Sequence, residues 1–192
     1  YLGGTSTETN DAIAVDNSGS VYLAGTTQSS DYPTVAGSYD VTYNLDNDVV
    51  ATKLNAAGSS MVYSTYIGGQ RADDATGIAI DGSGSAYITG VTQSSDFPTP
   101  NGVDKTYNGN ADLFVTKVST NGTALTYSTF VGGTGTEGGG AIAVDDNGAA
   151  YGPITIKDCD ISRHRTGISA QGGKDYTVTG NDLRGCGANS DE

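Results

Sequence analysis

The chain has no tryptophan, one methionine, one histidine and two cysteines among its 192 residues. Having a single histidine, His164, limits the classes of active site, because Ser-His-Asp and Cys-His catalysis both use a histidine base. The cysteines, Cys159 and Cys186, both lie in the last quarter of the chain and neither require nor exclude a disulfide bond. These three residues also lack the ligand spacing and the fourth ligand of a zinc site.

Basic residues are scarce, since 9 Lys and Arg stand against 22 Asp and Glu and give a formal net charge of -13. Such a charge disfavours binding to nucleic acid or to anionic lipid through long-range attraction. No hydrophobic run approaches the length of a membrane span, and no signal peptide is visible. We therefore expect neither a nucleic-acid partner nor membrane insertion, and the acidic composition fits an extracellular or surface-displayed protein.

Glycine and tyrosine are abundant, with 29 Gly and 12 Tyr against 3 Phe, which suits short strands joined by tight turns. The sequence YSTYIGG at 63–69 returns as YSTFVGG at 127–133, and its tail opens the chain as YLGG. The aromatic positions Tyr1, Tyr66 and Phe130 are 65 and 64 residues apart. A fixed period of this size predicts a repeat architecture.

Each full repeat predicts four short antiparallel strands, joined by turns and by one long polar loop. The predicted strands are 12–16, 21–25, 48–54 and 61–67 in the first copy, and 77–81, 86–90, 112–118 and 125–131 in the second. A third copy begins with a strand at 141–145. The fold class is therefore all-β, with two propeller-type blades and part of a third, each needing a neighbour to cover its faces.

The wording of these repeats closely resembles the SBBP family of bacterial β-propeller repeats. The resemblance rests on YSTYIGG, the AIAVD strand, the SSDFPT loop and FVTK, and it covers residues 1–151. Members of that family are typically large secreted or surface proteins without assigned catalytic residues. The resemblance therefore implies an architecture and an extracellular or cell-surface location, and no activity.

From Gly152 onward the wording changes. Residues 154–161 are echoed 22 residues later by residues 176–183, with short strands and Asn or Asp at the corners. This segment, 152–192, resembles about one and a half rungs of a right-handed parallel β-helix, as in pectate-lyase-like proteins. Three explanations fit two partial repeat systems: an excerpt of a longer protein, closure by neighbouring subunits, or a sequence joined from discontinuous pieces near Tyr151.

Two motifs have ordinary structural interpretations. The sequence GTGTEG at 133–138 fits G-x-G-x-x-G, but a strand rather than a helix is predicted after it, so we interpret it as an inter-blade loop. Asp16, Asp81 and Asp145 each follow a strand at a hairpin turn, and an aspartate that caps its own turn explains them better than a calcium loop.

We expect no resident cofactor, with calcium as the alternative. Asp73 and Asp74, with Glu137 and Glu8 in equivalent loops, supply oxygen ligands at one end of the blades but lack the spacing of a calcium motif.

The candidate contacts for a glycan or a protein partner are Tyr43 and Tyr107 in the long loops, and the basic cluster Arg163, His164 and Arg165. Exposed tyrosine rings can stack on sugars, although tyrosines that recur in register, such as Tyr22 and Tyr87, more often pack between blades. On a parallel β-helix, Arg163 to Arg165 would face an acidic polysaccharide, and a solvated corner is the alternative.

Three functions remain open. The first is a non-enzymatic extracellular or cell-surface repeat protein, structural or adhesive, that associates with itself or with neighbouring repeats of a longer chain. The second is part of a carbohydrate-active enzyme of the lyase or epimerase type, with a polysaccharide as partner. The third is a glycan-binding module of the lectin type.

Overall fold

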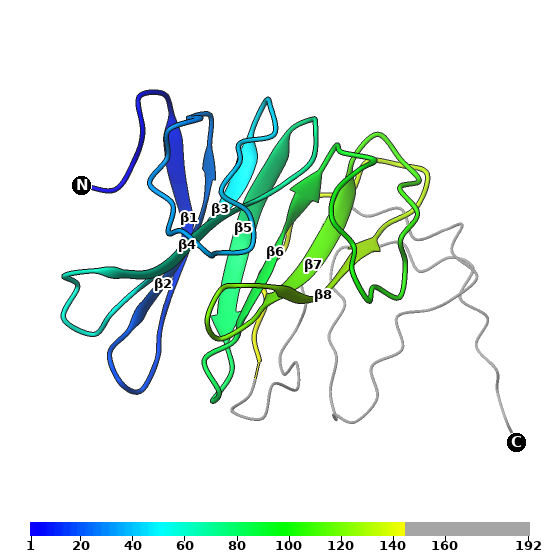
Figure 1. The fold of residues 1–192 in the computed structure, drawn as a ribbon. Coiled ribbons are helices and arrows are strands. Elements are labelled where there is room, and N and C mark those ends of the chain that lie inside the picture. Colours follow the sequence, from blue (N-terminus) through cyan, green and yellow to red (C-terminus); the bar gives the residue numbers. More distant parts are fainter. Residues whose placement is uncertain (145–192) are drawn as a thin grey trace, which may run out of the picture.

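The computed structural model describes residues 1–144, and these form two four-stranded antiparallel sheets with the same meander topology. The first blade consists of β1 (Glu8–Val15), β2 (Val21–Thr27), β3 (Asp48–Leu54) and β4 (Met61–Ile67). The second blade consists of β5 (Asp73–Ile80), β6 (Ala86–Thr92), β7 (Asp112–Val118) and β8 (Leu125–Val131). The two sheets stand beside each other in sequence order (Figure 1). The all-β prediction with repeated four-stranded units is confirmed.

The strand limits follow the sequence pattern closely. The four predicted strands 48–54, 61–67, 112–118 and 125–131 have the observed bounds of β3, β4, β7 and β8. β1 and β5 begin four residues earlier than predicted, because the polar residues ahead of Ala12 and Gly77 continue the ladder to β2 and β6 through a bulge. Bulges admit an extra residue without ending the pairing.

The strand predicted at 141–145 is wrong over its described part. Residues 141–144 form no strand in the structure, which describes the chain as far as residue 144. They lie beside the second blade, where the carbonyl of Gly140 accepts hydrogen bonds from Thr76 Oγ1 at 3.1 Å and Thr89 Oγ1 at 2.8 Å. Side-chain donors thus take the place of a backbone ladder. The β-helix-like segment 152–192 lies outside the described residues.

The main core fills the space between the two blades. Its buried members from the first blade include Tyr22, Ala24, Val49, Ala51 and Tyr63, and those from the second blade include Ile88, Phe97, Phe114 and Phe130. The rings of Phe97 and Phe114 stack with centroids 4.5 Å apart. Because neighbouring residues in a strand point to opposite faces, one face of each sheet supplies this core.

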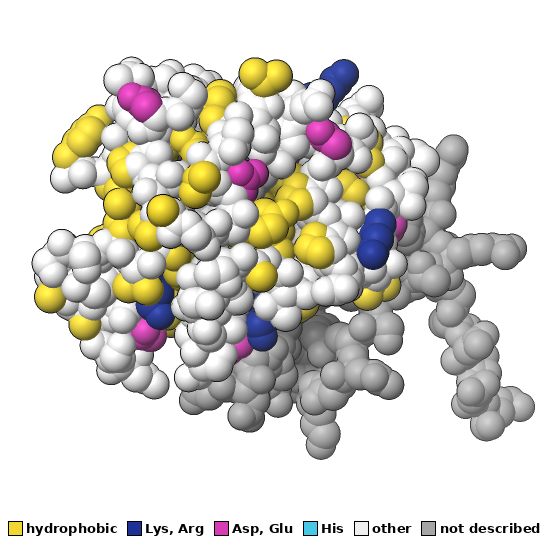
Figure 2. All heavy atoms as spheres, viewed as in Figure 1, with side chains coloured by type: hydrophobic (Ala, Val, Ile, Leu, Met, Phe, Trp, Pro, Cys, Tyr) yellow, Lys and Arg dark blue, Asp and Glu magenta, His cyan; other side chains and the backbone are white. Residues whose placement is uncertain are grey.

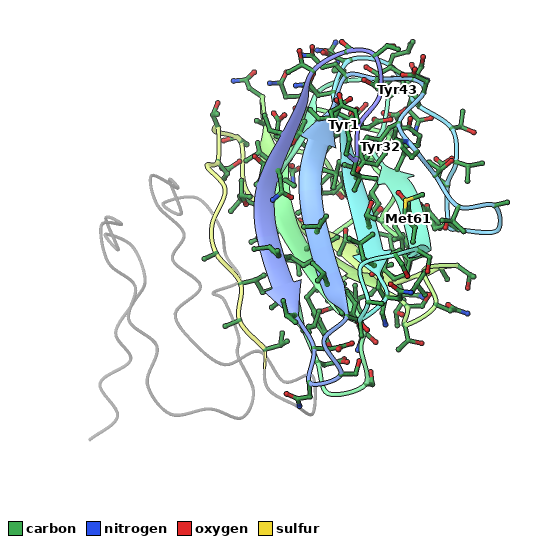
Figure 3. All side chains as sticks on the ribbon, turned by 90° about the vertical axis from the view of Figure 1, so that its left-hand side faces the viewer. Tyr1, Tyr32, Tyr43 and Met61 are labelled. Atoms are coloured by element: carbon green, nitrogen blue, oxygen red, sulfur yellow. The ribbon has the colours of Figure 1, made fainter. Side chains whose placement is uncertain are left out.

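We call the face of the second blade that enters this core its front face, carried by Ile78, Ile80, Ile88, Phe114 and Phe130. The repeat places Ile13, Val15, Leu23, Val50 and Tyr66 at the equivalent positions of the first blade, on the face that points away from the second blade. Figure 3 looks onto this first-blade front face, where Tyr32 and Tyr43 lie near one end of the sheet.

The first-blade front face has no neighbouring sheet among the described residues. Tyr32, Val50 and Tyr66 form a small cluster there with Leu2 and Tyr43. Hydrophobic side chains reach the surface on this side of the molecule, at the left of the view (Figure 2). Among residues 1–144 no helix has the length and apolar character needed to cross a lipid bilayer.

Candidate functional site

A hollow lies between the hairpin turns of the two blades. It has a volume of about 390 Å³, and we call it the turn groove. Its walls are the turn after β1 and the turn after β5, together with two side chains of the first sheet; the lining includes Asp16, Ser18, Tyr22, Lys53, Asp81, Ser83 and Gly84. The groove is polar because both turns begin with an aspartate.

Each of these aspartates caps its own turn, as predicted. Asp16 Oδ1 accepts hydrogen bonds from the backbone N–H of Ser18 at 2.9 Å and of Ser20 at 2.8 Å. Gly19 has a φ of +87°, a conformation that glycine adopts without strain. The hydroxyl of Ser18 also donates to Asp16, and these hydrogen bonds lower the pKa of the Asp16 carboxyl to about 2, against the opposing effect of burial.

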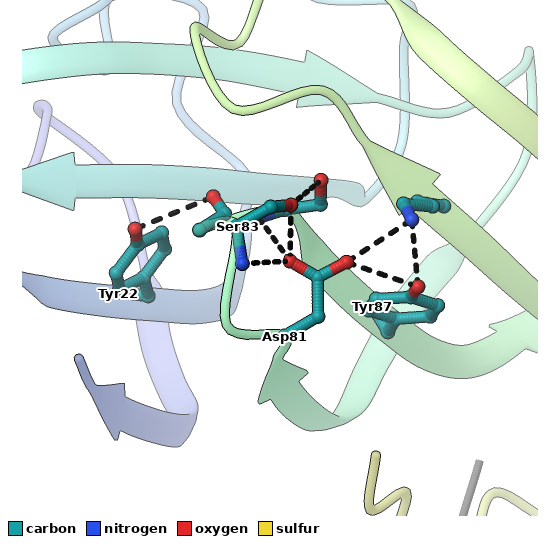
Figure 4. A network of polar contacts seen from close by, with 7 residues as sticks. Tyr22, Asp81, Ser83 and Tyr87 are labelled. Atoms are coloured by element: carbon teal, nitrogen blue, oxygen red, sulfur yellow. Dashed lines mark hydrogen bonds and ion pairs between the residues drawn. The ribbon is translucent and has the colours of Figure 1, made fainter. Parts of the chain in front are cut away.

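In the second blade the equivalent aspartate is the centre of a network (Figure 4). Asp81 Oδ2 accepts a hydrogen bond from Tyr87 Oη at 3.1 Å and forms an ion pair with Lys117 Nζ at 3.1 Å. Burial opposes ionisation of Asp81, but hydrogen bonds from Ser83 and Ser85 and the Lys117 ammonium together hold its pKa well below its usual range. This network holds three neighbouring strand ends in a fixed arrangement.

The first blade repeats these residue types with a different arrangement. Tyr22 Oη lies 3.2 Å from Asp16 Oδ2 and 3.3 Å from the carbonyl of Gly84, so this tyrosine connects the two blades. Lys53 Nζ lies 4.6 Å from the centre of the Tyr22 ring. Within the described part of the chain the ion pair of Lys117 has no counterpart at Lys53. The Lys53 ammonium therefore lies in the groove, available to an anion or a hydroxyl group.

A second hollow, with a volume of about 240 Å³, lies at the other end of the second blade. It is lined by Arg71, Gln93, Ser95, Tyr107, Gly109 and Asn110. Tyr107 donates a hydrogen bond to the Asn110 carbonyl at 2.6 Å, and its ring contacts Phe130 with centroids 6.0 Å apart. An aromatic ring beside guanidinium and amide groups is a combination that suits polyhydroxyl ligands.

The predicted contact residues fall in separate places. Tyr107 lines the second hollow, whereas Tyr43 packs against Tyr66, with ring centroids 5.9 Å apart, at the edge of the first-blade front face. Arg163, His164 and Arg165 lie outside the described residues, as do both cysteines. Tyr22 is fully buried between the blades, which confirms packing as its role.

The glycine motif at 133–138 lies in a loop, and residues 139–144 after it are not helical, so it lacks the helix that a dinucleotide-binding motif needs. Asp73 and Glu137 are buried, while Glu8 is half-buried. No spacing along the chain predicts that Asp73 lies beside Asp48 or that Glu137 lies beside Asp112, as they do in the structure. Lys53 and Lys117 were also missed, although each follows a threonine at one repeat position. Among residues 1–144 no group of three or more His, Cys, Asp or Glu is arranged to hold a metal ion.

Comparison with known families agrees with the repeat architecture. Residues 62–98, which span β4, β5, β6 and part of the following loop, match the family model of the SBBP beta-propeller repeat. No curated protein matches the chain. The chain therefore carries a propeller-type repeat.

Proposed function

We propose that this protein is a structural or adhesive repeat protein of the cell exterior, whose blades associate face to face with further blades of the same kind. One observation supports this proposal. The first-blade front face carries hydrophobic residues at the repeat positions that, in the second blade, form the interface with the first blade. The partner that fits it is the back face of another blade, in a second copy of the chain or in further repeats.

The internal interface provides the template for this association. In the second blade, Ile88 and Phe114 are completely buried against the back face of the first blade. At the equivalent positions of the first blade, Leu23 and Val50 line an apolar hollow of about 290 Å³ together with Leu2 and Tyr32. Further out on the same face, Ile13 is 61% exposed and Val15 is 57% exposed. Removing such surface from water stabilises a complex by about 25 cal/mol per Å² before the costs of association.

Sedimentation velocity of the full chain over a wide concentration range tests this proposal. We expect the sedimentation coefficient to rise with concentration, and we expect Ile13→Lys to abolish the rise because a charge on the contact face must be desolvated. Val103→Lys is the matched control, because Val103 is fully exposed in the loop between β6 and β7. A wild-type chain that stays monomeric at every concentration would rule out self-association.

The extracellular location needs its own test. Digestion of intact producing cells with an added protease should remove the protein if it is displayed outside. Full protection in intact cells, together with digestion after lysis, would rule out the location.

The second hollow favours glycan binding as an alternative function. Arg71, Gln93 and Tyr107 present charge, amide and aromatic groups within one hollow. A sugar bound there should change tyrosine fluorescence, and Arg71→Ala should abolish the change. Flat titrations across a panel of neutral and acidic sugars would exclude this alternative.

A further inference from the structure

Two pairs of buried acidic side chains each join the start of a blade's third strand to the segment that follows its fourth strand. The first pair is Asp48, at the start of β3, and Asp73, at the start of β5 in the other sheet. The second pair is Asp112, at the start of β7, and Glu137, in the loop that follows β8. The first three are fully buried and Glu137 is 1% exposed, so solvent does not hydrate these carboxyl groups.

Each acid has one oxygen that accepts a backbone hydrogen bond and one oxygen without a partner. The bonded oxygens accept from a nearby N–H: Asn44 to Asp48 at 2.7 Å, Gly69 to Asp73 at 2.7 Å, Asn108 to Asp112 at 2.9 Å and Gly133 to Glu137 at 3.2 Å. The oxygens without a partner are Asp48 Oδ1, Asp73 Oδ1, Asp112 Oδ1 and Glu137 Oε2. A buried oxygen with no partner is costly and is rare in folded proteins.

The carboxyl groups of each pair converge on one glycine. Asp112 Oδ1 and Glu137 Oε2, both without a partner, each lie 2.9 Å from the position that a Cβ would occupy on Gly132. In the first pair, Asp48 Oδ1, which has no partner, and Asp73 Oδ2 converge on Gly68, with the Asp73 oxygen at 2.8 Å. This Asp73 oxygen is the one that accepts hydrogen bonds from Gly69 N–H and from Ser94 Oγ at 2.9 Å. The repeated glycines thus make room for two carboxyl groups that face each other.

Backbone carbonyl oxygens lie close to the second pair of carboxyl groups. A Cβ on Gly109 would lie 3.0 Å from Asp112 Oδ1 and 3.0 Å from the carbonyl oxygen of Gly133, and it would also contact the carbonyl oxygen of Gly135. Asp112 Oδ1 therefore has both a carboxylate oxygen and main-chain oxygens around it. Carboxylates combined with main-chain carbonyls are the ligands that calcium takes in proteins.

Among residues 1–144 no ion pair with a lysine or an arginine balances these acids. Burial raises the pKa of Asp48 to about 7 and that of Asp73 to about 6, and burial also raises the pKa values of Asp112 and Glu137. The further charges that act on the four carboxyl groups, beyond the pairs themselves, are Asp40, Asp96 and Asp104, all of them acidic. The ion pair of Lys117 with Asp81 lies at the opposite end of β5. A bound cation would relieve the repulsion between the two carboxylates of each pair.

We propose that each pair binds one calcium ion, so that the metal joins neighbouring blades. The ligands available are all oxygens, which selects a hard cation over zinc or copper. Magnesium usually retains several water molecules, and carboxyl groups buried this completely leave little room for them. Glu8, the first residue of β1, takes the same repeat position as Asp73 and Glu137, but its Oε1 accepts hydrogen bonds from the hydroxyl groups of Thr27 and Ser29. We therefore assign two sites to residues 1–144.

The test uses the full chain, stripped with a chelator and transferred to metal-free buffer at pH 7.5. We expect isothermal titration with calcium chloride to give about two sites per chain. Calcium at 100 times its dissociation constant should raise the melting temperature by about 10–20 °C, because binding at both sites adds to the stability of the folded state.

Asp48→Asn and Glu137→Gln should each reduce the number of bound calcium ions from two to one. In chelator, Asp48→Asn should melt above the wild type, because an uncompensated buried charge is removed. Asp74→Asn is the matched control, since Asp74 neighbours Asp73 but accepts its hydrogen bond from Asn47 at 3.1 Å, and it should retain both ions.

Two results would overturn the proposal. A melting temperature that ignores calcium but rises on acidification to pH 5 would show that each pair shares a proton instead. Calcium binding with unchanged stoichiometry in both Asp48→Asn and Glu137→Gln would place the ions elsewhere on the acidic surface.

Discussion

The two front faces carry equivalent residues in different surroundings. Ile88 and Phe114 of the second blade lie in the core between the sheets, whereas Leu23 and Val50 of the first blade line a hollow at the edge of the described structure. The first strands of the two blades differ most. Ile13 and Val15 of β1 are largely exposed, whereas Ile78 and Ile80 of β5 pack against the core. The same sequence pattern therefore lies in a core in one blade and is partly exposed in the other, depending on whether another sheet packs against it.

This contrast shows that each blade needs a neighbouring blade to cover its front face. A sheet of this kind has two apolar faces and can cover neither alone. The first blade covers the front face of the second blade, where Phe114 takes the position of Val50 and stacks on Phe97. Substitutions at equivalent positions should therefore differ in cost, which the following predictions use.

The largest difference is expected for Ile88→Ala compared with Leu23→Ala. Ile88 is completely buried, so its truncation should cost about 2–5 kcal/mol through lost burial and a residual cavity. Leu23 is only half-buried, and its truncation should cost less than about 1 kcal/mol. Urea unfolding followed by far-ultraviolet circular dichroism measures both. Equal costs would mean that the two faces are equally covered, and the contrast would fail.

The pH dependence of stability should distinguish the buried pair Asp48 and Asp73 from Glu8, which takes the repeat position of Asp73 in the first blade. In chelator, the raised pKa values of Asp73 and Asp48 mean that folding takes up protons. Their contribution to stability is complete below pH 3.8 and is lost as the pH rises through about 6 to 7, so the melting temperature should fall between about pH 4 and pH 7 and then level off. The loss in unfolding free energy should be of the order of a few kcal/mol.

The matched variants for this titration are Asp73→Asn and Glu8→Gln. Asp73→Asn should flatten the decline above pH 5, because it removes one of the two facing carboxyl groups. Glu8→Gln should leave the decline unchanged, because Glu8 is half-buried and takes the same repeat position at the open edge. A decline that Asp73→Asn leaves intact would refute this assignment of the pH dependence.

The sequence predicted the strands far better than it predicted these acids. Alternation and repeated wording defined β3, β4, β7 and β8 because hydrophobic periodicity is a local signal. The pairing of Asp48 with Asp73 depends on how one sheet meets the next, which no spacing along the chain reveals. Asp48 was visible only as the first residue of a predicted strand, and its burial depends on Gly68 leaving room for it.

Two glycines at one repeat position offer a smaller test. A Cβ on Gly90 would overlap the carbonyl oxygen of Asp74 and would meet Phe114 Cζ at 2.5 Å, whereas a Cβ on Gly25 would overlap the carbonyl oxygen of Thr9. Gly90→Ala should cost about 1–3 kcal/mol, because Phe114 is held between the blades and cannot retreat. Gly25→Ala should cost less, because its front face is open and β1 can shift.

Thermal unfolding at low protein concentration compares these two glycine variants, with the second-blade variant expected to melt earlier. A larger loss for Gly25→Ala would show that the overlap with the backbone of β1 decides the cost, and that the neighbouring blade does not.

The smallest expected effect is that of Ile13→Thr, which keeps a β-branched side chain on β1. In dilute solution it should change the free energy of unfolding by no more than about 0.5 kcal/mol, because Ile13 is 61% exposed. Ile78→Thr, at the same position of the second blade, should cost more because Ile78 packs against the core. The cost of Ile13→Thr should grow with protein concentration if another blade covers the first-blade front face, since association adds to stability by mass action. A cost that is large at every concentration would instead mean that the face is already covered within the monomer.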